Sequence, residues 1–310
     1  MSSTLLSITG WTRDLQAVAA PPCATVDAWW ARHLEVAGQR TRPFDLAVMA
    51  GAGADRLAWA FASGYQAAAR ALLPDRPSDV RIAFCATEAG GNHPRAIETS
   101  IQETPDGTVV DGQKSFVTFG PQADVLLVIG STGIGADGRK QLRAVVVPAN
   151  TPGVHIEPMP ELPFVPEIPH ASVRFDGAHV AAPALPGDAY TAFLKPFRTI
   201  EDIHVHGAVL GHLAGLAHRT EGPREVLARA CAGITALSPL ADGDPLDPRV
   251  HLGLDAALAA TRELVADIGA LWPGVDEDTR ARWLRDQPLL RIAEGARRAR
   301  TRAARATLGG

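Results

Sequence analysis

Residues 111–120 read Asp-Gly-Gln-Lys-Ser-Phe-Val-Thr-Phe-Gly, and this stretch decides the fold. Its Asp-Gly pair is typical of a tight turn, and the Thr, Val and Phe that follow favour a strand. A related stretch, Phe84-Cys-Ala-Thr-Glu-Ala-Gly-Gly91, ends about twenty residues earlier and combines a strand with a glycine turn. The two stretches together predict that a β region is built around them.

The same alternation of short apolar runs and turns extends outward, from residue 80 to about residue 180. Asp-Gly pairs at 106–107, 137–138 and 176–177 separate these runs. Evenly spaced short strands predict an antiparallel barrel or sandwich and not a βαβ sheet. The predicted strands are 81–86, 108–110, 115–118, 125–130, 142–147, 154–158 and 171–175.

Helical periodicity and frequent alanine characterise the chain on both sides of this region. Before it, the predicted helices are 28–36, 44–61 and 64–73. After it, they are 189–218, 223–237, 250–271 and 276–308, and Pro196 is expected to interrupt the first of them. The sequence therefore predicts an α+β chain with helices, then strands, then helices.

Composition excludes several classes of protein. The 310 residues are 46% hydrophobic and carry a formal charge of −4, which gives no global attraction to nucleic acid. No apolar run is long enough to span a bilayer, and no basic segment precedes the short apolar patch at residues 5–8. Three widely spaced cysteines fit free thiols. We expect a cytoplasmic globular protein without membrane or nucleic-acid partners.

Several motifs along the chain resemble the acyl-CoA dehydrogenase family. Residues 84–91 are similar to the threonine-glutamate turn that opens the family's β domain, and residues 111–120 with Ala123-Asp124 are similar to its second hallmark. Residues 147–154 and 173–176 continue the order, and residues 64–74 resemble the preceding helix. The resemblance covers roughly residues 55–215. It implies a shortened N-terminal helical domain (1–79), a β domain that binds flavin and acyl thioester (80–182), and a helical C-terminal domain (183–310).

The resemblance also implies a FAD site. A flavin that accepts hydride needs hydrogen-bond donors at its polar edge and an aromatic wall that excludes water. Thr87 and Thr118 would donate to the isoalloxazine, and Phe116, where the family usually has tryptophan, would flank it. Gly91 would let the backbone approach flavin and substrate closely, and His93 stands where the family often has serine. Taken one at a time, these residues are equally typical of ordinary strands and turns.

The proton acceptor has two candidates. Residues 200–211 are similar to the first long helix after the β domain, where some family members carry the catalytic base, and Glu201 takes that position. Asp202 follows it, where the family usually has arginine. The alternative is Glu294, because residues 291–295 imitate the family's C-terminal loop. Glu294 ranks lower, since its Ala- and Arg-rich surroundings favour a solvated helix face.

Three other groups of residues are expected to have structural roles and not to bind a metal or a phosphate. Glu201 and His204 have the Glu-x-x-His spacing of di-iron proteins, but a second copy is missing, so no metal site is expected. The histidines at 204, 206, 212 and 218 are expected in a cleft or subunit interface. The arginines of residues 280–305 favour a surface helix or a subunit contact over a phosphate site.

The leading hypothesis is a FAD-dependent oxidoreductase that dehydrogenates the α,β bond of an acyl-CoA or acyl-carrier thioester, as a homodimer or homotetramer. A flavin-dependent monooxygenase on the same scaffold is one alternative. A non-catalytic scaffold or regulatory protein is the other, favoured by the loop 238–247, which lies where the family has a FAD-clamping segment.

Overall fold

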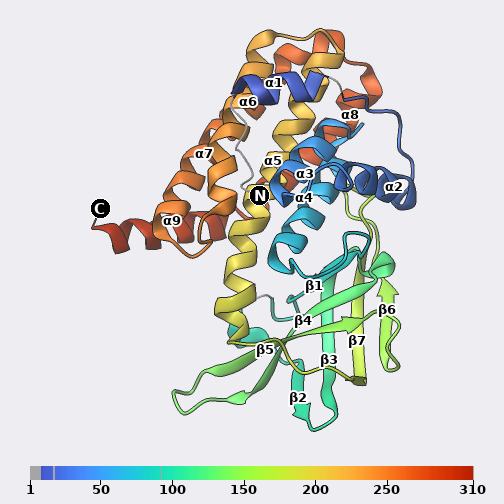
Figure 1. Cartoon of the computed structure of the whole chain (residues 1–310), viewed down its shortest axis with the longest axis vertical. Coiled ribbons are helices and arrows are strands. Elements are labelled where there is room, and N and C mark those ends of the chain that lie inside the picture. The colour runs from blue at the N-terminus through green and yellow to red at the C-terminus, as the bar shows by residue number, and fades with distance from the viewer. Residues whose placement is uncertain (1–7, 17, 92, 310) are drawn as a thin grey trace. The chain divides into compact units, whose positions relative to one another are not determined.

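The structure is a computed structural model that describes residues 8–16, 18–91 and 93–309 (Figure 1). Contacts divide it into two compact units. The helical unit comprises the residues up to Ala71, Pro163–Glu167 and those from Thr199 onward. The β unit comprises Leu72–Leu162 and Ile168–Arg198. The two terminal helical segments share one unit, and the three-domain boundaries stay a prediction.

Four helices open the helical unit: α1 (Ile8–Gln16), α2 (Val26–Ala37), α3 (Pro43–Ala52) and α4 (Leu57–Leu72). The Thr25 side chain caps α2 by accepting the Ala28 N–H at 3.2 Å. The break predicted at residues 62–63 lies instead at 53–56, between α3 and α4. Gly64 stays helical because it contacts α5, where a Cβ would lie 2.6 Å from the Val205 Cα.

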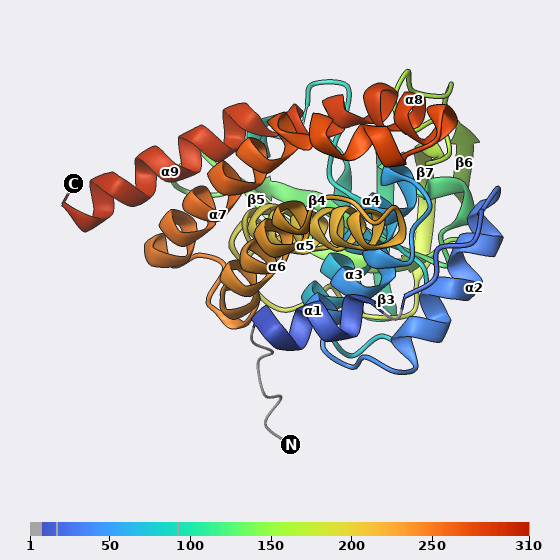
Figure 2. The ribbon, with the colours of Figure 1, turned by 90° about the horizontal axis from the view of Figure 1, so that it is seen from above.

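The other helices are α5 (Lys195–Arg219), α6 (Arg224–Leu237), α7 (Pro248–Ala266), α8 (Glu277–Asp286) and α9 (Glu294–Leu308). A π-helical turn, Tyr190–Leu194, precedes α5, and Pro196 lies in the first turn of α5, where proline is tolerated. Short 3-10 turns follow α6, α7 and α8, at Ser238–Asp242, Ile268–Gly274 and Gln287–Arg291. The second shortens the predicted helix 250–271, and the third splits the predicted helix 276–308. Helices α7 and α9 lie side by side (Figure 2).

Three of the histidines expected in a cleft are buried inside the helical unit. His204, His206 and His212 are at most 4% exposed, and each Nδ1 lies 2.7–3.0 Å from a backbone carbonyl oxygen. Burial lowers the pKa of all three to about 4. The expectation was therefore wrong for these three, because their backbone partners satisfy them within the core.

One seven-stranded sheet forms the β unit, in the order β1-β4-β2-β3-β7-β6, with β5 paired to β4. Alternating buried residues such as Val110, Val128 and Val173 form its core. The strands are β1 (Ile82–Cys85), β2 (Ser100–Thr104), β3 (Gly107–Thr118), β4 (Val125–Ile134), β5 (Lys140–Pro148), β6 (Val154–Pro158) and β7 (His170–Val180).

The sheet differs from the prediction in four respects. Strand β2 was missed, and the two strands predicted within 108–118 are one strand, β3. The Asp111-Gly112 pair forms a bulge in β3 and no turn, with Gly112 at φ +138°. Strand β1 runs parallel to β4, whereas a wholly antiparallel sheet was expected. The α+β architecture of helices, a central strand unit and helices is confirmed.

Candidate active site

The turn after β1 lies beside β3. The Ser115 N–H donates to the Thr87 carbonyl oxygen at 2.9 Å, which extends the pairing of the turn with the strand. Glu88 and Gly91 exchange two backbone hydrogen bonds, of 3.1 and 2.8 Å, and so close the turn. This contact brings the threonine-glutamate motif against the second motif, as the resemblance implied, within one unit.

An irregularity in β3 carries Phe116 outward. Pairing with β7 shifts register between Lys114 and Val117, and Phe116 adopts φ +52° there. Its side chain is 55% exposed, whereas Val117 beside it is buried. The Phe116 N–H donates to the Met159 Sδ at 3.4 Å. A phenylalanine held outside the core in left-handed backbone is a strained arrangement that is typical of binding sites.

Thr118 ends β3 opposite His170 of β7. Its side chain and that of Thr87 are both half-buried. Two side-chain atoms in the same unit, Ser115 Oγ and Gln122 Oε1, are buried and have no hydrogen-bond partner among the described residues. Unpaired buried polar atoms are rare, and they suggest a polar partner that protein groups do not supply.

A buried ion pair anchors the turn. Lys114 Nζ lies 2.6 Å from Glu88 Oε1 and donates to the Ile129 carbonyl oxygen at 2.5 Å. The Glu88 carboxylate also accepts the N–H groups of Glu98 and Thr99 at 2.7 and 3.1 Å. Burial raises the pKa of Glu88, but Lys114 and these N–H groups outweigh it and leave the pKa below its usual value.

The two predicted substrate residues follow this turn. Gly91 has φ +101°, and a Cβ built on it would meet no atom within 4 Å. The backbone there is therefore open to close approach, and a side chain would strain it. His93 is exposed, and its Nδ1 accepts the Arg95 N–H at 3.2 Å, which caps the short helix Pro94–Ala96. His93 thus has a local structural task.

These groups fit a flavin. An exposed phenyl ring, two half-buried hydroxyls and two unsatisfied polar atoms lie along one end of β3 and the adjoining turns, and an isoalloxazine needs both an apolar wall and hydrogen bonds. The residues that would hold FAD are Thr87, Phe116 and Thr118, with Ser115 and Gln122 as further partners that the sequence did not suggest. Ser115 and Gln122 are identified only by their buried oxygen atoms that have no hydrogen-bond partner, which a sequence cannot show.

Both candidate bases belong to the helical unit. Glu201 is half-buried in the second turn of α5. Glu294 is the first residue of α9 and pairs with Arg298 at 2.8 Å, in the way expected of a solvated helix face. Within the described ranges, no group of three His, Cys, Asp or Glu side chains is arranged to hold a metal ion.

Asp202, next to Glu201, is 6% exposed and holds two arginines of α9. Its carboxylate lies 2.7 Å from Arg297 Nη2 and 2.7 Å from Arg300 Nη2. The expectation of a surface helix is therefore wrong for these two arginines, which dock α9 onto α5. Their spacing of three residues on one helix face was the available signal.

Residues 83–178 match the family model of the acyl-CoA dehydrogenase middle domain. An acyl-CoA dehydrogenase of Mycobacterium tuberculosis is 28% identical over 185 residues, or 54% of this chain and 47% of that protein. A phosphoenolpyruvate guanylyltransferase of Mycolicibacterium vanbaalenii is 30% identical over 158 residues, or 51% and 63% of the two chains.

The fold is similar to that of butyryl-CoA dehydrogenase from Megasphaera elsdenii, with a TM-score of 0.70 and 14% identity over 100% of both chains. The prolyl acyl carrier protein oxidase AnaB gives a TM-score of 0.71 at 16% identity, over 98% of this chain and 99% of that one. Since the fold agrees with the dehydrogenases, the transferase likeness adds no activity here.

Fold and motifs together define an acyl-CoA dehydrogenase-like architecture. By sequence, residues 83–178 belong to the acyl-CoA dehydrogenase family, and the chain has the fold of that family. The match to the Mycobacterium tuberculosis relative spans about half of that protein's length. No helix in the described part of the chain is long and apolar enough to cross a membrane.

Proposed function

We propose that this protein is a FAD-dependent oxidoreductase that dehydrogenates the α,β bond of an acyl thioester. The arrangement of β3 and the turn after β1 carries the proposal, because it brings the turn that bears Thr87 beside the strand that bears the exposed Phe116 ring and Thr118. The buried Lys114–Glu88 pair fixes that turn. A site built for a planar polar ring would need these features.

Each residue of the proposed site has a separate role. The Thr87 and Thr118 hydroxyls donate hydrogen bonds at the polar edge of the ring, and Phe116 excludes water from its flank. The FAD, when bound, supplies a hydride acceptor. Glu201 takes the α-proton of the thioester onto its carboxylate as the general base. Gly91 allows the substrate to approach the backbone, and His93 lines the approach.

The substrate is an acyl-CoA or an acyl-carrier thioester. Proteins of similar fold include one named for each carrier. One is a butyryl-CoA dehydrogenase, and the other is a prolyl acyl carrier protein oxidase. We propose a homodimer or homotetramer, because flavin sites of this family lie between subunits. We also propose a cytoplasmic location.

Anaerobic bleaching of the flavin by butyryl-CoA, or by prolyl acyl carrier protein, tests the proposal. Reduction should remove the visible flavin absorbance of the full chain. Glu201→Gln should slow bleaching by about 10²–10⁴-fold without loss of colour, because the isosteric amide cannot accept the proton. Glu294→Gln is the matched control and should bleach at the parent rate.

Other outcomes would redirect the assignment. Slow bleaching in Glu294→Gln alone would move the base to that residue. A yellow protein that neither thioester bleaches, but that with reduced flavin and oxygen inserts one oxygen atom into a substrate and releases the other as water, would be a monooxygenase. A chain that does not bind FAD would be a scaffold or regulatory member of the family.

A further inference from the structure

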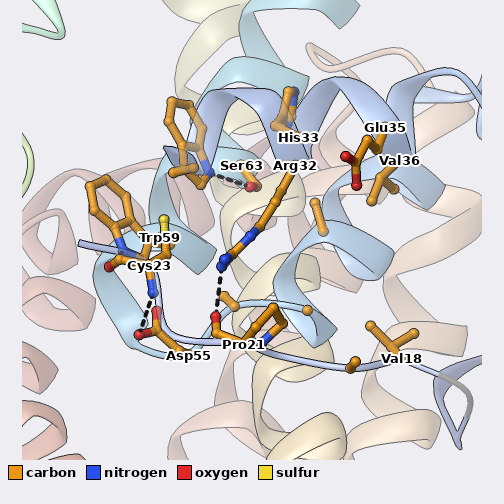
Figure 3. Close-up of a pocket in the computed structure, with 15 residues that line it drawn as sticks. Val18, Pro21, Cys23, Arg32, His33, Glu35, Val36, Asp55, Trp59 and Ser63 are labelled. Carbon is orange, nitrogen blue, oxygen red and sulfur yellow. Dashed lines mark hydrogen bonds between the residues drawn. The ribbon is translucent and has the colours of Figure 1, made fainter. Parts of the chain in front are cut away.

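A cavity of about 270 Å³ lies within the helical unit (Figure 3). Helices α2, α3 and α4 and the segment from Val18 to Cys23 enclose it. Its volume is just below the range of about 300–1,000 Å³ that is typical of pockets for drug-sized ligands. None of the residues assigned to the flavin or the thioester lines it. The cavity is therefore a candidate site for a separate small ligand.

Two tryptophans form its aromatic wall. Trp29 and Trp59 stack with ring centroids 5.9 Å apart and planes 9° apart. Each indole N–H already has a partner, since Trp29 Nε1 donates to Ser63 Oγ and Trp59 Nε1 donates to the Cys23 carbonyl oxygen, both at 2.9 Å. An indole has no other donor, so the wall offers apolar ring surface and fixed geometry.

His33 is the polar group that stays unsatisfied. It lines the cavity, is 1% exposed, and stacks against Trp30 with centroids 5.2 Å apart. Neither ring nitrogen has a hydrogen-bond partner among the described residues. Burial, together with the charge of Arg70, lowers the pKa of His33 to about 3. The imidazole is therefore neutral near pH 7, with one donor and one acceptor that no described residue engages.

Two of the three charged residues of the lining are already engaged. The Arg32 guanidinium donates to the Pro21 carbonyl oxygen at 2.6 Å (Figure 3) and to the Pro22 carbonyl oxygen at 2.9 Å. Asp55 accepts the Cys23 N–H at 3.1 Å and pairs with Arg56 at 2.9 Å. Glu35, the third, is exposed and therefore hydrated. An anion would gain no free counter-charge and a cation would share Glu35 with solvent, so an uncharged ligand is favoured.

We propose that this cavity binds a small uncharged aromatic molecule that bears a hydroxyl group. The ligand ring packs against Trp29 and Trp59, and the hydroxyl exchanges a hydrogen bond with His33. The site is separate from the proposed flavin site, and its occupancy does not depend on the dehydrogenase assignment. A purely apolar ligand would leave the imidazole unsatisfied, which separates the hydroxyl-bearing class from simple hydrocarbons.

Calorimetric titration of the full chain with four matched probes tests this proposal. Phenol should bind one site per chain at pH 7. Toluene, which lacks the hydroxyl, should bind at least about tenfold more weakly. Benzoate and benzylamine, which carry charges at this pH, should bind more weakly still.

Variants assign the binding to the cavity. His33→Phe keeps an aromatic ring and removes both nitrogens, so phenol should lose its advantage over toluene. Ala50→Leu places a larger side chain in the lining and should abolish binding of both probes. His155→Phe, at an exposed position on β6, is the control and should bind phenol like the parent chain. Circular dichroism and the melting temperature verify that each variant folds.

Three results would overturn the site. They are the absence of phenol binding at millimolar concentration, tighter binding of benzoate or benzylamine than of phenol, and unchanged phenol binding in a folded His33→Phe or Ala50→Leu chain. Because Ala50→Leu leaves His33 intact, failure of one variant to fold leaves the other as a test. Flavin absorbance should be the same with and without phenol.

Discussion

At the scale of single residues, the Lys114–Glu88 pair holds the candidate active site together. Lys114 is fully buried and Glu88 is 7% exposed, so neither charge is stabilised by bulk water. Each is satisfied instead by the other and by backbone groups, since Lys114 reaches the Ile129 carbonyl and Glu88 holds two N–H groups. Breaking such a pair leaves an uncompensated charge inside the β unit.

Lys114→Met should therefore lower the free energy of unfolding by about 3–5 kcal/mol. Urea unfolding measures it. Lys140→Met is the control in the same unit, because Lys140 pairs with Glu98, whose side chain is 78% exposed, and the expected loss is below about 1 kcal/mol. Equal losses in the two variants would contradict the anchoring role of Lys114.

At the scale of elements, α5 organises the helical unit through two kinds of contact. Small residues let α3 and α4 approach it closely, since a Cβ on Gly211 would lie 2.2 Å from the Val48 carbonyl oxygen. A buried charge cluster docks α9, through Asp202 with Arg297 and Arg300. Both contacts lie on the helix that carries Glu201, so both stabilise the element that bears the proposed base.

Gly211→Ala should destabilise the chain by about 1–3 kcal/mol, because the added methyl group has no room between α3 and α5. Gly295→Ala in α9 is the matched control, since a Cβ there meets no atom within 4 Å. Alanine is the better helix former, so this control should be neutral or stabilise by up to about 1 kcal/mol. Thermal melting distinguishes the two signs.

Asp202→Asn should cost about 3–5 kcal/mol, because two guanidinium groups lose their shared buried carboxylate. Asp255→Asn removes the looser contact of α7 with Arg305, at 3.6 Å, and should cost less than about 1 kcal/mol. Hydrogen exchange should increase across α9 in the first variant only. Undiminished protection of α9 in Asp202→Asn would show that packing alone docks the helix.

Much of this architecture could be predicted from the sequence, because strands and helices leave periodic patterns. The β6 bounds 154–158 are the predicted ones, and α6 begins within one residue of its predicted start. The failures arise where tertiary contacts override local preference. Gly64 continues α4 because α5 needs the space, and Asp111-Gly112 bulges within β3 instead of turning.

The residues of the candidate site also fall into two groups, those that the sequence indicates and those that only the structure identifies. Motif order indicated Thr87, Phe116 and Thr118, and the structure places them on β3 and the turn that pairs with it. The assignment of their roles stays a prediction. Ser115 and Gln122, the docking of Asp202 and the cavity at His33 depend on burial and on partners distant in the chain, which no local pattern reports.

At the scale of the whole molecule, buried neutral histidines make stability depend on pH. The pKa values of His204, His206 and His212 are lowered to about 4, and that of His33 to about 3, mainly by burial. The unfolded chain, with ordinary histidine pKa values near 6.5, binds more protons than the folded chain below that pH. Stability is therefore full above about pH 6.5 and is lost as the pH falls toward 4.

Urea unfolding at pH 7, 6 and 5 should show this loss. Each such histidine contributes a slope of at most about 1.4 kcal/mol per pH unit. His33→Phe should reduce the slope by up to that amount, whereas His155→Phe, at an exposed position, should not change it. A free energy of unfolding that is constant from pH 7 to pH 5 would contradict the buried, neutral state of these side chains.

The proposed cofactor residues belong to the β unit and the proposed base to the helical unit. The most direct measurement is a titration of the full chain with FAD, followed by visible absorbance and by quenching of flavin fluorescence. We predict saturable binding that Thr118→Val weakens by about tenfold, one hydrogen bond's worth, while Thr132→Val on the exposed part of β4 leaves it unchanged. Binding that is absent, or equally strong in Thr118→Val, would contradict a flavin site at the end of β3.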